Sequence, residues 1–98
     1  MCDLDMLEKR LVTATGREKV DILIELGRVL YLKDPERMRI YIEEAHQLAR
    51  ELNYTIGIAN SLRIKGNLYW VAGDYKSAMD HYQGAKKVYD RLEDFENL

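Results

Sequence analysis

The stretch Gly66–Ala85, GNLYWVAGDYKSAMDHYQGA, decides the fold. Small residues alternate with aromatic residues at helical spacing, since Gly66 stands three residues before Tyr69 and Ala78 stands four residues before Tyr82. Gly and Ala let two helix backbones approach closely, and Tyr rings fill the space beside them. The triplet AGD in the middle supplies a tight turn. The stretch therefore predicts two antiparallel helices packed as a hairpin.

The composition is that of one ordinary globular domain. The chain has 98 residues, of which 47% are hydrophobic, and a net charge of −2. This charge gives no reason to expect nucleic acid or an anionic membrane as a partner. The single Cys2 cannot form an internal disulfide, no apolar run is long enough to span a bilayer, and the N-terminus lacks a signal-peptide pattern. We therefore expect a cytoplasmic protein.

Apolar residues recur at steps of three and four along the whole chain, and we find no strand-like alternation. Asp34 precedes Pro35 and predicts a helix start, because Asp is a good cap and Pro suits the first helical position. Thr15 is a second candidate cap, and Asn53 can end a helix in a left-handed conformation. The sequence predicts an all-α fold of about five helices, at residues 3–14, 17–32, 35–52, 55–72 and 75–92.

The second and third helices repeat in the fourth and fifth. When the second helix is laid on the fourth, Gly27 meets Gly66 at an offset of 39. When the third is laid on the fifth, Ile42 meets Tyr82 at an offset of 40. The chain thus contains two copies of one helix hairpin behind an extra helix. The first copy covers residues 17–52 and the second covers residues 55–92.

The two copies resemble the tetratricopeptide repeat. The resemblance is carried by Leu26-Gly27-x2-Leu30, by Gly66-x2-Tyr69, and by Asp74-Tyr75-x2-Ala78-x3-Tyr82-x2-Ala85. The chain departs from the usual pattern in a longer period and in the absence of the closing Pro. Such long repeats are similar to those of bacterial signalling proteins, where they precede kinase, cyclase or transcription-regulator modules. The resemblance implies a single domain, a right-handed α-α superhelix of antiparallel hairpins, and a role in binding other proteins.

The two ends of the chain lead to two further expectations. Residues 93–98 align with the start of the fourth helix, so we expect them to be the truncated start of a third repeat. The uncapped fifth helix and Phe95–Leu98 would then expose apolar surface, and self-association would cover it. At the other end, Leu4, Leu7 and Leu11 recur on one face, and we expect that helix to cap the array.

A groove is the expected binding site, because the first helix of each stacked hairpin lines the concave side. Arg63 and Asn67 stand four apart, so a guanidinium can bind a carboxylate while the amide bonds a peptide backbone. This pair resembles half of the carboxylate clamp of chaperone-binding tetratricopeptide domains. Alternatively, Arg63 pairs with a neighbouring carboxylate and Trp70 is buried against the next helix. The expected groove residues are Asp21, Ile24, Arg28, Tyr31, Asn60, Arg63, Asn67 and Trp70.

Catalytic machinery is not expected. His46 and His81 do not occupy matched repeat positions and have no evident set of metal ligands, and the six Gly are too scattered for a phosphate loop. We therefore expect no enzyme activity, no cofactor and no metal. Two functions remain open: a module that binds a partner peptide or domain in its groove, or a regulatory and dimerisation segment of a signalling protein with no peptide ligand.

Overall fold

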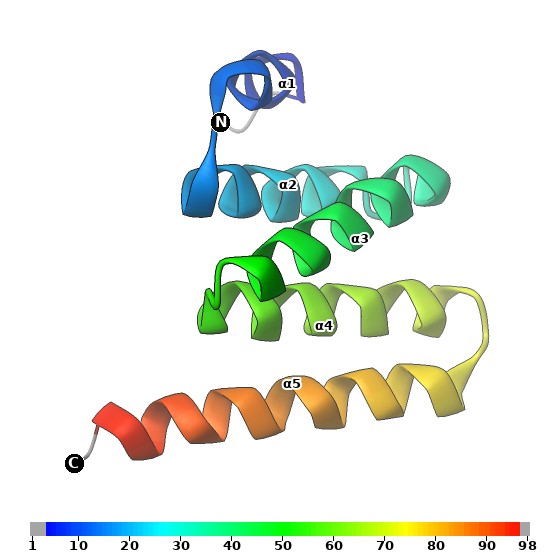
Figure 1. The fold of residues 1–98 in the computed structure, drawn as a ribbon. Helices are drawn as coiled ribbons and strands as arrows, with labels where there is room; N and C mark the ends of the chain where they lie inside the picture. Colours follow the sequence, from blue (N-terminus) through cyan, green and yellow to red (C-terminus); the bar gives the residue numbers. More distant parts are fainter. Residues whose placement is uncertain (1–3, 97–98) are drawn as a thin grey trace.

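The fold consists of helices stacked one on the next (Figure 1). The computed structural model describes residues 4–96, and the side chains of residues 4–93. In this part of the chain α2 to α5 form the stack, successive helices run in opposite directions, and α1 lies across α2 at one end. The predicted all-α fold is therefore confirmed. The helices are α1 (Leu4–Thr13), α2 (Gly16–Leu30), α3 (Pro35–Glu51), α4 (Thr55–Val71) and α5 (Tyr75–Glu96).

The starts of α3 and α5 show the repeat at atomic level. The Asp34 carboxylate accepts a hydrogen bond from the backbone N–H of Arg37 at 3.3 Å, and Asp74 accepts one from the N–H of Ser77 at 3.2 Å. Each bond satisfies one of the free N–H groups in the first turn of a helix. Thr15 stands at the cap position of α2 as predicted, but its side chain makes no capping bond.

Three turn residues adopt the left-handed conformation. Asn53, at φ 54°, ends α3 as predicted, and Gly73, at φ 84°, ends α4. Leu32 has φ 69°, which is unusual for a residue without the small or polar side chain that eases this conformation. The predicted second helix therefore ends at Leu30 rather than at residue 32.

The end of α5 differs from the prediction. Residues 93–96 continue α5 instead of starting a third repeat after a turn. The reason is local, because Glu93 occupies the position that Asn53 holds in the first copy, and Glu has no preference for the left-handed conformation that stops a helix. The predicted apolar surface at Phe95–Leu98 lies outside the side chains that the structure describes.

The two hairpins pack through the same small-residue contact. A Cβ atom on Gly27 would lie 2.7 Å from Cγ1 of Ile42, and one on Gly66 would lie 2.5 Å from Cε1 of Tyr82. A residue larger than glycine at either position would force the facing side chain to shift. Gly27 corresponds to Gly66 in the repeat, and Ile42 corresponds to Tyr82. The two copies of the hairpin are therefore alike in their packing as well as in their sequence.

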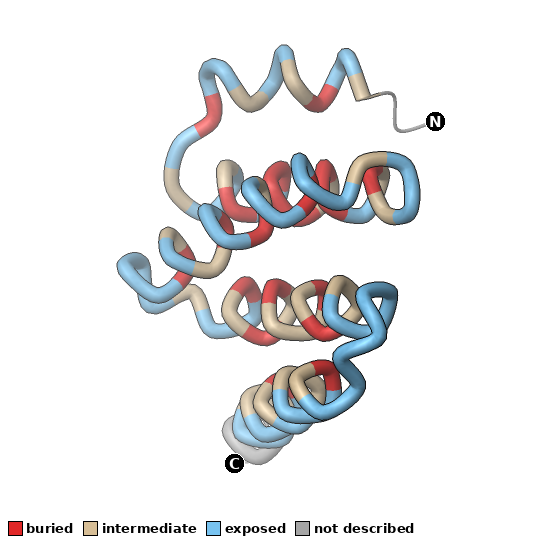
Figure 2. Tube along the Cα trace, turned by 90° about the vertical axis from the view of Figure 1, so that its right-hand side faces the viewer, coloured by how far each residue is buried: buried red, intermediate tan, exposed pale blue. Residues whose placement is uncertain are grey.

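The core is concentrated on the α2 side of the molecule (Figure 2). Helix α2 packs against α1, α3 and α4, whereas α5 packs against α4 alone among the helices. The largest buried cluster consequently comes from α2 and α3, with Ile64 as the buried residue from α4. On α5, the fully buried hydrophobic residues among the described side chains are Ala78 and Ala85.

Helix α1 covers the outer face of α2. Leu7 is buried against Ile22 and Leu26, and Leu4 and Leu11 pack around this cluster. The first helix thus lies on the face of α2 that its Leu residues were expected to cover. Within the described part of the chain, none of the helices has the length and apolar character needed to cross a membrane.

Candidate functional site

A hollow of about 140 Å³ opens where the two hairpins meet, between α2 and α4. Met38 and Ile64 supply its apolar base, and both are buried. Its polar lining comes from both hairpins. Arg28, Tyr31, Arg63 and Asn67 line it, and these are four of the residues that the sequence analysis assigned to the groove.

Tyrosines of α5 form hydrogen bonds with polar side chains on the α4 side of the hollow. The Tyr82 hydroxyl donates a hydrogen bond to Oδ1 of Asn67 at 2.6 Å, and the Tyr89 hydroxyl donates one to Asn60. Nε of Arg63 donates to the Tyr89 hydroxyl at 3.5 Å. Asn60 and Asn67 stand seven apart, as do Tyr82 and Tyr89, so the two antiparallel helices carry matching pairs.

These bonds leave donors free for a ligand. Asn67 uses its carbonyl oxygen toward Tyr82, and its NH₂ group remains available. Arg63 bonds a tyrosine through Nε, and its two terminal nitrogens form no ion pair with any described carboxylate. Among the described side chains Arg63 thus has no acidic partner, which was the alternative that the sequence left open.

The α2 side adds a second guanidinium and an aromatic ring. Nη1 of Arg28 lies 3.7 Å from Oε2 of Glu25, one turn earlier on the same helix. Such a partly exposed pair at this distance is weak and can be displaced. Tyr31 packs partly against the core. Burial raises the pKa of the Tyr82 hydroxyl, with a further rise caused by Tyr31 and an opposing effect of Arg63.

The hollow therefore combines positive charge with hydrogen-bond donors above an apolar base. Two guanidinium groups line it, and among the described carboxylates the half-buried Glu25 pairs with Arg28 and none pairs with Arg63. Guanidinium groups bind carboxylates through two parallel hydrogen bonds, and these charge-assisted bonds are stronger than neutral ones. This arrangement suits a carboxylate attached to a short apolar group.

The other predicted groove residues lie elsewhere. Ile24 is buried in the main core because α2 is covered on three sides. Asp21 accepts a hydrogen bond from the Tyr54 hydroxyl at 2.8 Å. Trp70 is 51% exposed and packs edge-on against Tyr75 with 4.7 Å between ring centroids, so it is neither in the hollow nor in the core.

A serine and a histidine from different helices meet in space, although the sequence did not pair them. Nδ1 of His46 lies 3.0 Å from the hydroxyl oxygen of Ser61, and that hydroxyl donates to the carbonyl of Ile58 at 2.9 Å. Because the Ser61 proton points to the carbonyl, His46 must donate through Nδ1, and it does not accept the proton as a catalytic base would. Ser61 is also fully buried, so the pair is a structural contact.

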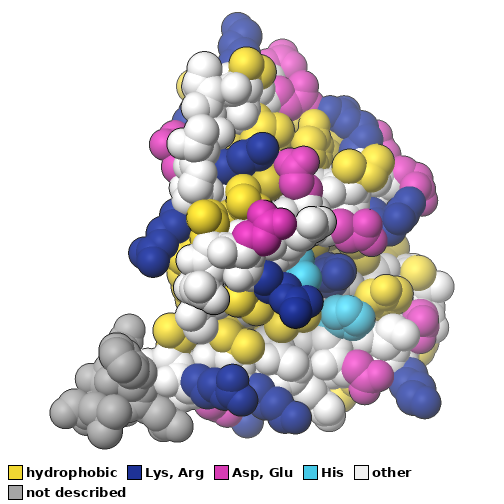
Figure 3. All heavy atoms as spheres, viewed as in Figure 1, with side chains coloured by type: hydrophobic (Ala, Val, Ile, Leu, Met, Phe, Trp, Pro, Cys, Tyr) yellow, Lys and Arg dark blue, Asp and Glu magenta, His cyan; other side chains and the backbone are white. Residues whose placement is uncertain are grey.

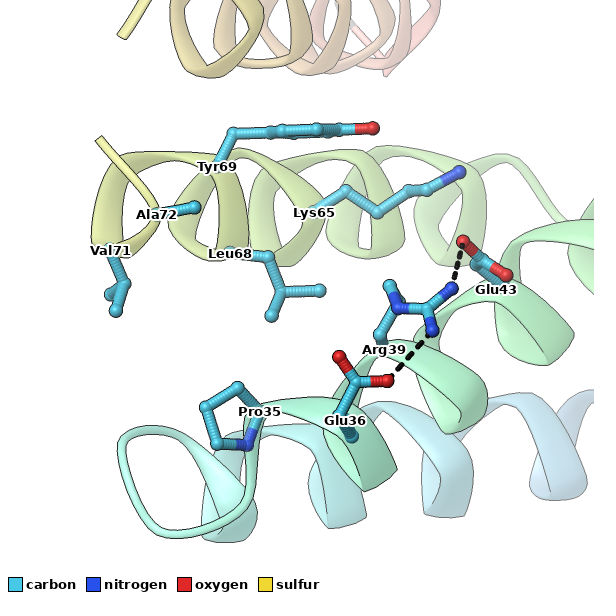
Figure 4. A pocket seen from close by; sticks show the side chains of 9 residues that line it. All are labelled: Pro35, Glu36, Arg39, Glu43, Lys65, Leu68, Tyr69, Val71 and Ala72. Carbon is cyan, nitrogen blue, oxygen red and sulfur yellow. Dashed lines mark hydrogen bonds and ion pairs between the residues drawn. The ribbon is translucent and has the colours of Figure 1, made fainter. Parts of the chain in front are cut away.

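A second, larger hollow of about 310 Å³ lies between α3 and α4 (Figure 4). Leu68, Val71 and Pro35 give it apolar walls. Its guanidinium is already occupied, since Arg39 lies 2.8 Å from Glu36 and 3.8 Å from Glu43. This α3–α4 hollow consequently offers apolar surface, but it has fewer free polar groups than the hollow between α2 and α4.

Comparison with known proteins gives no information on the function of the chain, so the functional argument depends on the residues described above. No protein-family model, curated protein or solved structure matches the chain. Among the described residues, no group of three or more His, Cys, Asp or Glu side chains is placed to hold a metal ion.

Proposed function

We propose that the chain is a helical-repeat module of the tetratricopeptide type that binds an acidic peptide segment in the hollow between α2 and α4. The observation that carries this proposal is the convergence of Arg28 and Arg63 at one hollow, each with donor capacity that the fold does not use. The peptide carboxylate would lie between the two guanidinium groups.

The neighbouring residues support a peptide rather than a free ion. The NH₂ group of Asn67 can donate to a backbone carbonyl, and the Tyr31 ring gives a flat apolar contact at the same hollow. Met38 and Ile64 at the base favour an apolar side chain next to the acid. The partner class is therefore a peptide with adjacent acidic and apolar residues.

The test is fluorescence anisotropy with a labelled octapeptide that alternates Glu and Leu and ends in a free carboxylate. The matched control peptide carries Gln for Glu and a C-terminal amide. We expect saturable binding of the first peptide and none of the second. Loss of one charge-assisted bond would raise Kd roughly tenfold, so Arg28→Gln should have this effect.

Arg28 is the preferred site for the variant because its side chain is exposed and not part of the core. Arg63→Gln should also weaken binding, although it removes the bond to Tyr89 as well. Arg91→Gln, an exposed Arg on α5, is the control and should bind like the parent. Equal binding of the two peptides, or equal affinity of Arg28→Gln and Arg91→Gln, would contradict the proposal.

Self-association as part of a larger signalling protein is the second candidate. It is favoured by an exposed apolar group at the α4–α5 turn, formed by Trp70, Val71, Tyr75 and Met79. Patches of this kind mark interaction sites. Light scattering behind gel filtration tests it: a dimer that Trp70→Ser and Met79→Ser convert to a monomer supports it, and a monomer at high micromolar concentration rejects it.

A further inference from the structure

The hollow between α3 and α4 has apolar walls that the peptide proposal does not use. Figure 4 shows Leu68 and Val71 pointing from α4 toward Pro35 at the start of α3. Val71 and Pro35 are exposed, so their apolar surface is in contact with water when the hollow is empty. The residues that line this hollow and those that line the hollow between α2 and α4 are different sets.

The volume of the α3–α4 hollow limits the size of its occupant. The hollow measures about 310 Å³, which is within the usual range of roughly 300–1,000 Å³ for ligand pockets. It is twice the size of an apolar cavity of ~150 Å³ that holds one benzene molecule. A single phenyl ring would therefore leave half of the hollow empty, whereas two fused rings fit it.

The charged groups around the hollow balance one another. Two acids line it, Glu36 and Glu43, and so do two bases, Arg39 and Lys65. Figure 3 shows the same mixture more widely, with Lys and Arg side chains interspersed with Asp and Glu side chains on the face that α3 forms. A charged occupant would gain little attraction from such a balanced set and would lose hydration beside the apolar walls. The hollow consequently favours an uncharged molecule.

The guanidinium group of Arg39 gives the hollow a preference for an aromatic molecule. Its Nη2 donates to Oε2 of Glu36 at 2.8 Å, and its Nη1 lies 3.8 Å from Oε1 of Glu43. These contacts engage the edge of the planar group, because its N–H bonds lie in its plane. The faces of the guanidinium are the part that can stack on an aromatic ring.

Arg39 lacks the aromatic partner that other arginines of the chain have. Two of them lie over tyrosine rings, at 5.1 Å and 6.0 Å from the ring centroids. Among the described residues Arg39 has no such ring. Tyr69 lines the same hollow, but its ring packs on His81 of α5, with 4.8 Å between ring centroids. An aromatic ligand would supply the missing contact.

We propose that the α3–α4 hollow binds an uncharged small molecule of two fused aromatic rings. One ring stacks on the guanidinium of Arg39, and the other lies against Leu68 and Val71. Burial of apolar surface supplies most of the affinity, and the cation–π contact selects an aromatic molecule over a saturated one. The site does not depend on the peptide proposal, because it shares no lining residue with the hollow between α2 and α4.

The test is a titration of the isotope-labelled chain with three bicyclic probes, followed by backbone amide NMR. The probe 2-naphthol is aromatic and uncharged at neutral pH, decahydro-2-naphthol is its saturated counterpart, and 2-naphthalenesulfonate is aromatic but charged. We expect saturable shifts around Leu68 and Val71 with 2-naphthol, and a Kd roughly threefold lower than for either control probe. Equal affinity for 2-naphthol and decahydro-2-naphthol, or no saturable shifts at these residues, would overturn the proposal.

Two matched pairs of variants make the test specific. Arg39→Met keeps an unbranched side chain but removes the planar cation, and should raise the Kd for 2-naphthol roughly threefold. Arg50→Met, at an exposed position of the same helix, should leave it unchanged. Val71→Thr exchanges a wall methyl for a hydroxyl and should also raise the Kd roughly threefold, whereas Val12→Thr on α1 should not.

The same titration distinguishes a free ligand from a side chain of a partner protein. N-acetyltryptophanamide carries the fused rings of a Trp side chain and no charge, and we expect it to bind more weakly than 2-naphthol because its two amide groups have no free partners between the apolar walls. Tighter binding of N-acetyltryptophanamide, or equal affinity of Arg39→Met and Arg50→Met for 2-naphthol, would contradict the assignment of the hollow to a free aromatic molecule.

Discussion

The α2–α3 hairpin and the α4–α5 hairpin share one pattern but differ in what holds them together. In the first, Gly27 faces Ile42, which is fully buried in the apolar core. In the second, Gly66 faces Tyr82, which is half-buried and hydrogen-bonded to Asn67. The first hairpin therefore contains most of the buried apolar packing. In the second hairpin, polar groups at the edge of the hollow replace part of that packing.

The position of each hairpin in the stack explains this difference. Helix α2 has neighbours on three sides, whereas α5 packs on α4 alone among the described helices. A side chain at the repeat position in α5 therefore keeps contact with water, and a Tyr can satisfy its hydroxyl there while an Ile would gain less from burial. The difference between the hairpins can be tested by substitution at matched positions.

The largest effect is expected at Ile42. Its side chain is fully buried, so Ile42→Ala should lower the free energy of unfolding by about 3 kcal/mol, through lost apolar burial and the cavity that remains. Ile40, on the same helix, is 58% exposed, and Ile40→Ala should change it by less than about 0.5 kcal/mol. Urea denaturation measures both, and similar losses would refute the assigned core.

The close approach of the helices in both hairpins can be tested with three Gly→Ala variants. At Gly27 and Gly66 the new Cβ atom would collide with Ile42 and Tyr82, and overpacking costs about 1–3 kcal/mol. At Gly84 the nearest atom, Cδ1 of Leu62, is 3.7 Å away, so the gain in helix propensity of about 1 kcal/mol remains. We expect a net loss of stability at the first two positions and a gain at Gly84. A gain at all three would contradict the described packing.

The polar contact of the second hairpin predicts a smaller effect. Tyr82→Phe keeps the ring and removes the bond to Asn67, and the free energy of unfolding should fall by about 1 kcal/mol. Tyr75, whose hydroxyl bonds no described residue and which is 56% exposed, gives the control Tyr75→Phe. Equal urea midpoints for these two variants would show that the Tyr82 bond does not stabilise the hairpin.

The smallest effect concerns pH. Burial and positive neighbours lower the pKa of His46 in the folded protein, so the unfolded chain binds more protons there. The stabilising contribution is complete above the unfolded pKa of about 6.5 and is lost as pH falls through the lower folded value. Urea midpoints measured on both sides of that window should decline toward acid, and His46→Gln should reduce the decline. A profile unchanged in His46→Gln would argue against this role.

The periodicity was sufficient to predict the helices and the hairpin pairs. The small residues Gly27 and Gly66 indicate close approach, and Asp34 and Asp74 indicate helix starts, because these are local properties of residue type. The end of α5 was missed because the prediction followed the alignment of residues 93–98 with the start of the fourth helix, although Glu93 lacks the left-handed preference of Asn53.

Four of the eight predicted groove residues line the hollow, because Arg28, Tyr31, Arg63 and Asn67 lie on helix faces that the repeat orients. Ile24 was misplaced since a one-helix pattern does not reveal that α2 is covered on three sides. The roles of Tyr82 and Tyr89 were missed, although their spacing of seven matches that of Asn60 and Asn67. The meeting of His46 with Ser61 depends on how α3 and α4 pack, which no motif encodes.

The central claim is that the hollow between the two hairpins is the binding site. The most direct test is to map backbone amide NMR shifts during titration with the acidic Glu-Leu octapeptide. We predict saturable shifts that centre on Arg28, Tyr31, Arg63 and Asn67 and leave the outer face of α5 unchanged. Shifts centred on Trp70 and Tyr75 at the α4–α5 turn, or no saturable shifts, would contradict the claim.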